Sequence, residues 1–373
     1  MSAPWAVGTD ALVDELWRAV ADGDEYTAVG VVRRARADGT DEETLLLDVI
    51  AAVQARVGRE WAADRLTVAQ EHAAAVNERV ITVLVHDRSP AGRDERPPRG
   101  RVTVGRVDGE WHAMPARPVA EVLRLRGRRV DYLGARTSTP HLVSHLHSTS
   151  AEAVLLSGSI PTHLPAAHAV VTACQAVGVP VLPVLAGGRA FGPDGRYARA
   201  LGADHWAPDA RTAPDARTAA AVPDRAPAPP DPTAARQVLD DLPHLADQEY
   251  TYVARARGRL VRQTLTSLEK RFPALRAYTD AQRERTAEDL AHIVDFLATA
   301  LYVDDTALFT TFLCRTADVL QARRVPAHSL VAALAVLGEN LLDFPRALRL
   351  IGDGTAALAG RPLPPVPGAR PTA

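Results

Sequence analysis

A histidine placed just after an acidic residue is the most chemically suggestive feature of this sequence. Glu110 and His112 lie in the segment 108–115, which follows a run of alternating valines and precedes a helix-like apolar repeat. Open α/β sheets bind their ligands at such strand-to-helix loops. A carboxylate that holds one imidazole nitrogen leaves the other free to bind a metal ion, so this pair predicts a metal-ligating histidine.

The segments around this loop predict the sheet that positions it. Apolar, strand-like runs alternate with helix-like runs, as is typical of doubly wound parallel sheets. Residues 201–206 supply a further helix-to-strand unit. We therefore predict a Rossmann-like, flavodoxin-type domain with a five-stranded parallel sheet over residues 100–209. Its first four strands fall at residues 102–107, 129–134, 153–159 and 179–188.

Small residues end two of these strands. Ser157 closes the third, and Gly187 and Gly188 close the fourth. Glycine lets a bulky group approach the main chain closely. A small hydroxyl and bare backbone at successive strand ends therefore predict a pocket for a large ligand.

The strand-end residues together resemble the cobalamin-binding domain of methionine synthase and its relatives. In that family the cofactor binds with its own base detached and a histidine in its place. The resemblance implies that His112 is the lower axial ligand of cobalt. It also implies that Glu110, Ser157, Gly187 and Gly188 contact cobalamin.

Three positions depart from the family pattern. Glu110 replaces an aspartate, Pro115 replaces a glycine, and Ser159 stands where leucine is usual. Glutamate preserves the carboxylate, whereas proline changes the turn.

Residues 9–84 have the three- and four-residue apolar spacing of an antiparallel four-helix bundle. Its last helix is expected from residue 60 to about residue 84. On that helix Trp61 and His72 would share one stripe, about 16 Å apart along the axis. Gly58 is expected as a stop signal before it.

Trp61, followed after nine residues by Glu71 and His72, resembles the signature of light-sensing cobalamin proteins. In that family the bundle caps the upper face of the corrin, and the Trp and Glu shelter the adenosyl group of adenosylcobalamin. The resemblance implies cobalamin-binding roles for Trp61, Glu71 and His72. Ala62 departs from the family, whose members place a histidine there as the upper ligand after illumination.

Beyond the sheet the composition shifts to Ala, Pro, Asp and Arg over residues 210–233, which indicates a linker. Four amphipathic helix patterns follow within residues 234–352, with prolines between them. The tail at residues 360–373 is rich in proline and is expected to be disordered.

The order of bundle, sheet and helical module resembles the photocobilins, photoreceptors that combine cobalamin with a linear tetrapyrrole such as biliverdin. The resemblance implies a globin-like or phycobiliprotein-like C-terminal domain. Carboxylate-binding arginines, polar partners for pyrrole nitrogens and a thioether cysteine would form its bilin pocket. The candidates are Arg255, Arg262, Asp289, His292 and Cys314.

Composition excludes several classes of function. The 373 residues have a net charge of −2 and are 47% hydrophobic, so no basic surface for nucleic acid is indicated. No apolar run is long enough for a membrane span, and two isolated cysteines favour a reducing compartment. We expect a cytoplasmic protein without direct contact to DNA or membrane.

The resemblance implies a signalling photoreceptor, and we expect no enzyme because no nucleophile, phosphate loop or paired carboxylates stand out. Adenosylcobalamin and biliverdin are its expected chromophores. Output is expected through an unidentified partner protein, a homodimer or a light-dependent oligomer. Two alternatives remain, a corrinoid methyl carrier of a methyltransferase system and a haem-binding globin-type sensor in the last third.

Overall fold

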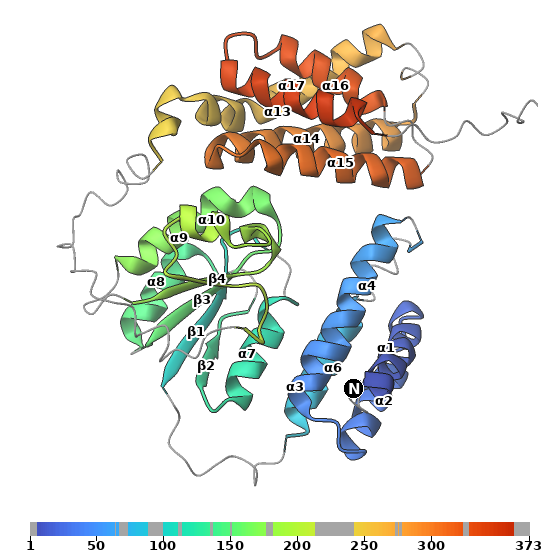
Figure 1. The fold of residues 1–373 in the computed structure, drawn as a ribbon, viewed down its shortest axis with the longest axis vertical. Coiled ribbons are helices and arrows are strands. Elements are labelled where there is room, and N and C mark those ends of the chain that lie inside the picture. Colours follow the sequence, from blue (N-terminus) through green and yellow to red (C-terminus); the bar gives the residue numbers. More distant parts are fainter. Residues whose placement is uncertain are drawn as a thin grey trace, which may run out of the picture. The chain divides into compact units, whose positions relative to one another are not determined.

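The chain divides into two compact units, Met1–Leu242 and Pro243–Ala373. Figure 1 shows the elements of both, coloured along the sequence. In this computed structural model the described residues are 6–63, 65–66, 74–88, 100–110, 114–134, 137–149, 151–176, 182–212, 242–272, 275, 278–323 and 328–361. The expected linker, beyond residue 212, and the expected tail, beyond residue 361, lie outside them.

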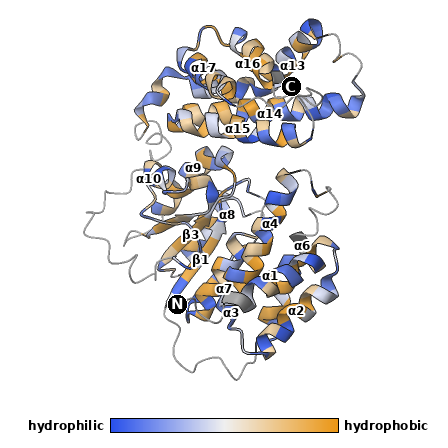
Figure 2. Cartoon of the chain, turned by 45° about the vertical axis from the view of Figure 1, so that its right-hand side comes forward, coloured by the Kyte–Doolittle hydropathy of each residue, from blue (hydrophilic) through white to orange (hydrophobic). Residues whose placement is uncertain are grey.

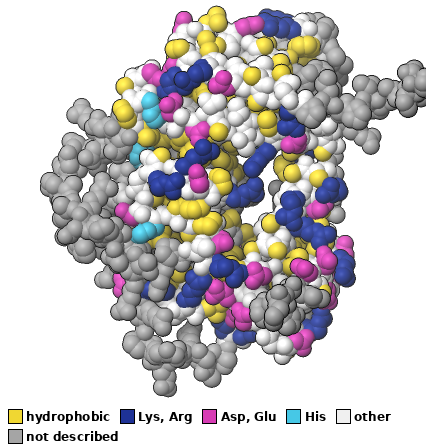
Figure 3. Space-filling view, in the orientation of Figure 1, with side chains coloured by type: hydrophobic (Ala, Val, Ile, Leu, Met, Phe, Trp, Pro, Cys, Tyr) yellow, Lys and Arg dark blue, Asp and Glu magenta, His cyan; other side chains and the backbone are white. Residues whose placement is uncertain are grey.

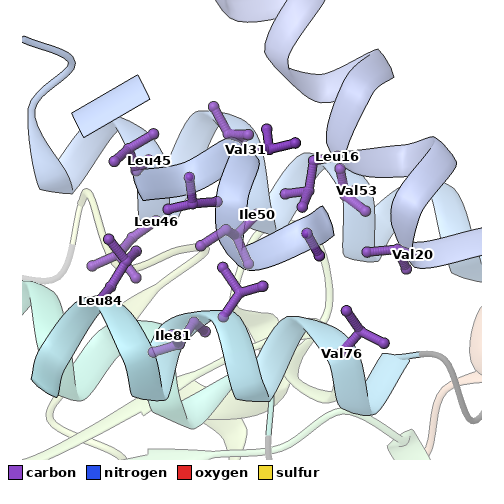
Figure 4. Packing of buried hydrophobic residues seen from close by; sticks show 14 of the residues in the cluster. Leu16, Val20, Val31, Leu45, Leu46, Ile50, Val53, Val76, Ile81 and Leu84 are labelled. Atoms are coloured by element: carbon purple, nitrogen blue, oxygen red, sulfur yellow. The ribbon is translucent and has the colours of Figure 1, made fainter. Parts of the chain in front are cut away.

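The first unit begins with an N-terminal bundle. Its helices are α1 (Ala6–Ala21), α2 (Glu25–Ala37), α3 (Glu42–Thr44), the π-helix η1 (Leu45–Ile50), α4 (Ala51–Ala62) and α6 (Ala74–His86). Leu45 and Ala51 keep helical backbone angles, so α3, η1 and α4 form one continuous helical rod over residues 42–62. Leucine, isoleucine and valine side chains from all of these helices except α3 fill the core (Figure 4).

The expected final helix over residues 60–84 is wrong. Trp61 instead lies at the end of α4, and the backbone leaves the helical region at Ala63. The predicted stripe shared by Trp61 and His72 on one helix is therefore wrong as well. Gly58 does not stop a helix but lies inside α4. A helical glycine costs only about 1 kcal/mol, and buried Val53 and Val57 hold this helix in the core.

The five-stranded parallel sheet is confirmed. It consists of β1 (Arg101–Arg106), β2 (Arg129–Tyr132), β3 (Ala153–Ser157), β4 (Val184–Gly187) and β5 (His205–Ala207). The strand order is β2-β1-β3-β4-β5, with every pair parallel. This is the flavodoxin order, in which the reversal of direction between β1 and β3 marks the ligand edge.

Helices cover both faces of the sheet. α7 (Ala116–Leu125) packs on one face, where Ala116, Ala120 and Leu123 join the even-numbered residues of β1. α8 (Thr139–Ser148) and α9 (Leu164–Gln175) pack on the other face. Figure 2 shows the apolar strands between them. Short helices η3 (Pro161–His163), η4 (Arg189–Phe191) and α10 (Arg196–Ala200) complete the domain.

The second unit is helical, as expected. After η5 (Pro243–Asp247) come α13 (Glu249–Arg271), α14 (Asp280–Val303), α15 (Thr306–Ala322), α16 (His328–Glu339) and α17 (Pro345–Ala359). The sequence pattern missed α17 and ended the domain at residue 352. Buried Glu249 fixes the start of α17 by accepting the backbone N–H groups of Arg346 and Ala347, at 3.0 and 2.8 Å.

The exterior carries charges of both signs. Arginine and acidic side chains are interspersed over the face seen in Figure 3, which agrees with the small net charge of −2. Across the described ranges no helix combines the length and the apolar character that a membrane crossing requires.

Candidate functional site

The loop after β1 turns sharply at its first residues. The backbone N–H of Glu110 donates to the carbonyl of Val107 at 3.0 Å, and Gly109 between them has a φ of 83°. A positive φ at the third position of a four-residue turn favours glycine. The turn sends the Glu110 side chain into the protein, where the residue is only 4% exposed.

Glu110 ties the loop after β1 to the loop after β3. Its Oε2 accepts the backbone N–H of Ser159 at 2.7 Å and lies 3.6 Å from Nδ1 of His163. Ser159 therefore contributes its backbone at the position where the family has leucine. His112 lies outside the described residues, so its contact with Glu110 and its role as a cobalt ligand stay predictions.

The glycines at the strand ends bring two loops together. A Cβ on Gly188, whose φ is 98°, would lie 2.4 Å from the carbonyl oxygen of Gly158. Gly158 in turn donates its N–H to Gly187 at 3.0 Å, and its own Cβ would press on Phe191 at 3.2 Å. Ser157, just before this contact, is 8% exposed. The contact with Gly158 therefore requires glycine at position 188, and no sequence pattern pointed to the role of Gly158.

Within the described ranges, several buried polar atoms at the carboxyl ends of the strands have no hydrogen-bond partner. They are both terminal nitrogens of Arg106, the hydroxyl of Tyr132 and Oγ of Ser159. Buried polar groups are normally paired, so atoms left open in one region point to a ligand. The predictions from sequence did not include this feature. The signal that could have identified it is an arginine at the end of an apolar strand.

The other histidines of the domain do not form a metal centre. Nε2 of His145 lies 3.1 Å from Oδ2 of Asp131, whereas His168 is buried with 2% exposure. His168 is therefore a core histidine and not a solvated one. Within the ranges that the structure describes, no three His, Cys, Asp or Glu side chains cluster as metal ligands would.

Of the three residues predicted to cover the upper face of the corrin, the structure describes Trp61 alone. Trp61 is partly buried at the C-terminal end of the helical rod, and Ala62 follows it. Glu71 and His72 lie outside the described residues. Their predicted roles therefore rest on the sequence.

The candidate bilin residues lie on three helices of the second unit. Arg255 and Arg262 are exposed on α13, and Asp289 and His292 are exposed on α14. Cys314, on α15, is partly buried, and its carbonyl accepts from Arg361 at 2.8 Å. Arg255 also lines a shallow groove of about 470 Å³ along α13. None of the other four candidates lines that groove.

An ionic cluster that the sequence analysis missed joins the bundle to the sheet domain. Glu121 of α7 is fully buried and pairs with Arg88 at 2.8 Å and with Arg124 at 2.5 Å. Arg117 lies 3.1 Å from the same carboxylate. Arg88, which follows α6, also donates from Nε to Glu42 of the rod at 2.6 Å.

Two further ion pairs lie beside this cluster. Arg126 pairs with Glu43 at 2.6 Å, and Arg211 pairs with Asp48 at 2.7 Å. Val122 of α7 belongs to the core of the bundle. One end of the helical rod is therefore fixed to the sheet domain by charge and by packing.

Two family models match the first part of the chain. Residues 12–84 match one described as a B12 binding domain, and residues 100–215 match a second with the same description. No curated protein matches the chain.

The solved structures that are similar to the chain include three corrinoid or cobalamin proteins. The monomethylamine corrinoid protein of Methanosarcina barkeri is 18% identical with a TM-score of 0.48, over 57% of this chain and 98% of that one. A cobalamin-binding protein from Desulfitobacterium hafniense is 20% identical with a TM-score of 0.30, over 56% and 95%. A methanol:cobalamin methyltransferase complex from Methanosarcina barkeri is 18% identical with a TM-score of 0.29, over 54% and 76%.

The two matched segments coincide with the N-terminal bundle and with the parallel sheet domain, whose ligand edge carries Glu110 and Ser157. The chain is therefore a cobalamin-binding protein with a cobalt corrinoid as its cofactor.

Proposed function

We propose that this protein is a cobalamin-dependent light sensor and not an enzyme. One observation carries the proposal. Trp61 ends a helical rod whose opposite end is bonded to the sheet domain through Glu42, Glu43 and Asp48. The two ends are about 28 Å apart at 1.5 Å per residue. We therefore expect a displacement at Trp61 to be transmitted along the rod to the ion pairs between the N-terminal bundle and the sheet domain.

The residues at the strand ends fit a corrinoid. The open nitrogens of Arg106 and the open hydroxyls of Tyr132 and Ser159 supply hydrogen-bond donors for a large polar ligand. On the proposed arrangement His112 binds cobalt from below, and Glu110 anchors its loop. Adenosylcobalamin would supply a cobalt–carbon bond that visible light breaks.

In this proposal the N-terminal bundle is the moving element. Trp61 would shelter the adenosyl group in the dark, and loss of that group would free the end of the rod at Trp61 to move. A ligand that favours one of two arrangements in this way biases a two-state element. Output then passes to a partner protein or to a second copy of the chain.

Light sensing is tested by hydrodynamics as well as by absorption, because free adenosylcobalamin is itself broken by light. The protein loaded with adenosylcobalamin in the dark should change its hydrodynamic radius or oligomeric state on green illumination. Trp61→Ala should still bind the cofactor but lose that change, and Trp61→Phe should retain part of it. An unchanged radius after complete photolysis would rule out sensing.

The lower ligand has its own test. His112→Ala should weaken cobalamin binding or shift the cobalt absorption bands. A His163→Ala variant is the matched control, because its ring lies beside Glu110 and is not the proposed ligand. Wild-type cobalt bands in His112→Ala would overturn the assignment.

The second unit is proposed to bind biliverdin through Arg255, Arg262, Asp289 and His292. Added biliverdin should then produce a red-absorbing band that His292→Ala shifts. A bilin that stays on the protein in a denaturing gel, and is lost in Cys314→Ser, would show the thioether. A spectrum equal to that of free biliverdin would leave cobalamin as the single chromophore.

A corrinoid methyl carrier is the second candidate. Ala62 favours it, because the position after Trp61 cannot supply an upper ligand after illumination. The exposed positions of the four polar bilin candidates favour it as well. A carrier loaded with methylcobalamin should lose its methyl group to a methyltransferase and its acceptor in darkness, with no change of radius in light.

A further inference from the structure

The guanidinium of Arg106 is buried without an acceptor for its terminal nitrogens. The residue ends β1 and is 4% exposed. Its Nε donates to the carbonyl of Gly134 at 3.1 Å, while Nη1 and Nη2 have no hydrogen-bond partner among the residues that the structure describes. A charged group is rarely buried unless it is paired, so this arrangement is costly in the protein alone.

The sheet register places Arg106 beside two other polar side chains. Arg106 lies opposite Ser157 on β3, and Val104 of the same strand lies opposite Tyr132 on β2. Residues paired in register, or two apart along a strand, share a face of the sheet. Arg106, Tyr132 and Ser157 therefore occupy one face at the carboxyl end of three neighbouring strands.

The surroundings of this face are cationic and rich in donors. Arg117 lies over the Tyr132 ring at 5.4 Å. The buried carboxylate of Glu121, which acts on Tyr132, is already shared by three arginines. Burial raises the pKa of the Tyr132 phenol, so its hydroxyl stays a proton donor. These side chains suit an anion with several acceptor oxygens.

We infer that Arg106, with Tyr132, binds the phosphodiester of the nucleotide tail of cobalamin. This inference rests on the cobalamin site at the same strand ends. The corrin side chains are neutral amides, and the phosphodiester is the one anionic group of the tail. A guanidinium matches phosphate oxygens with two parallel hydrogen bonds. Arg106 is thus a specificity residue that selects corrinoids with a complete tail.

The test compares cobalamin with cobinamide, which has the same corrin but lacks the phosphodiester and the base. Affinities are measured for the full chain and for Arg106→Gln. The variant should bind cobalamin at least about tenfold more weakly and cobinamide almost as well as the unchanged protein. Arg106→Lys should give an intermediate loss of cobalamin affinity, because lysine keeps the positive charge but cannot make the two parallel hydrogen bonds of a guanidinium. Arg101→Gln, at the other end of β1, is the matched control and should change neither affinity.

Stability without ligand separates recognition from a structural role. Because two of its nitrogens are unpaired, Arg106→Gln should leave the thermal unfolding of the ligand-free protein unchanged or raise its midpoint. Equal losses of affinity for both corrinoids, or full affinity for cobalamin, would overturn the inference. If the unchanged protein bound neither corrinoid, the site itself would be refuted and the role of Arg106 with it.

Discussion

Gly158 and Gly188 define the strand ends at the scale of single residues. A Cβ on Gly188 would collide with the carbonyl of Gly158 at 2.4 Å, and a Cβ on Gly158 would press on Ala190 and Phe191 at 3.2 Å. The same contact aligns Ser157 with the end of β4, because Ser157 lies in register with Gly187. The shape of the proposed tail pocket therefore depends on two residues that carry no functional group.

Gly188→Ala should lower the free energy of unfolding by about 2 kcal/mol or more. It combines an unfavourable positive φ with a clash against the carbonyl of Gly158. Urea unfolding measures the change. Gly30→Ala is the matched control, because Gly30 lies in α2 with open space at its Cβ, and it should be neutral or stabilising by up to about 1 kcal/mol. Equal stability of the two variants would contradict this account.

The start of the helical rod should make stability depend on pH. Asp41 accepts the backbone N–H of Thr44 at 2.9 Å and its hydroxyl at 2.6 Å, and these hydrogen bonds lower the pKa of the Asp41 carboxyl. A carboxyl whose pKa is lowered on folding stabilises the protein above its unfolded pKa of about 3.9. That contribution is lost as the pH falls through the lower, folded pKa.

Asp41→Ala should therefore cost about 1 kcal/mol at neutral pH, as loss of a helix N-cap does. The difference from the unchanged protein should shrink below about pH 4. Chemical unfolding at several pH values measures it, with exposed Asp22→Ala as the control. A difference that stays constant down to pH 2 would refute the carboxylate role.

The sequence predicted Glu110, Ser157 and the glycine pair because strand ends carry recognisable residue types. It did not predict Arg106, Gly158 or Glu121 as parts of a site. Their roles arise from contacts between strands or modules far apart in the sequence, and register is what brings them together. The sequence predicted Trp61 as a cobalamin-binding residue but placed it on the wrong helix. The reason is that a helix boundary leaves only a weak signal in an alanine-rich segment.

At the scale of elements, α7 connects the two modules of the first unit. Ala116, Ala120 and Leu123 face the sheet, and Val122 enters the core of the N-terminal bundle. Glu121, between them, pairs with Arg88 of the bundle module and with Arg124 of α7. α7 is therefore the element through which motion of the bundle would reach the sheet.

Glu121→Gln should destabilise the first unit by about 3 kcal/mol, because removing one partner leaves buried charge uncompensated. The variant should also weaken the response to light, since the rod loses its fixed end. Glu15→Gln is the control, as Glu15 forms an exposed pair with Arg34 and should change stability by less than about 0.5 kcal/mol. Thermal unfolding and the hydrodynamic assay report both effects. Similar stabilities of the two variants would show that the cluster does not hold the modules together.

At the scale of the whole molecule, both segments that match B12 binding domains lie in the first unit. Both family matches end by residue 215, whereas the second unit begins at Pro243. The sequence predicted the order of bundle, sheet and helical module. It missed α17, because a proline at its first position reads as a break, although proline is well tolerated there.

Thermal unfolding should therefore show two transitions. Added cobalamin should raise the midpoint of one and leave the other unchanged, because a ligand stabilises only the unit that binds it. A fragment of residues 243–361 should retain the second transition and its helical circular dichroism. A single transition that cobalamin shifts as a whole would show that the two units unfold together.

The π-helix η1 has a consequence for the direction in which Trp61 points. A π-turn holds one residue more than an α-turn, and each helical residue advances the chain by about 100°. Within the continuous rod over residues 42–62, the π-turn therefore determines the direction about the helix axis in which the side chains of α4 point. If the six residues Leu45–Ile50 formed ordinary α-turns instead, Trp61 would be rotated by about a quarter turn about the axis, because the wider π-turn is what takes up the extra residue. The orientation of the tryptophan is thus encoded a dozen residues before it, in a local excess of one residue.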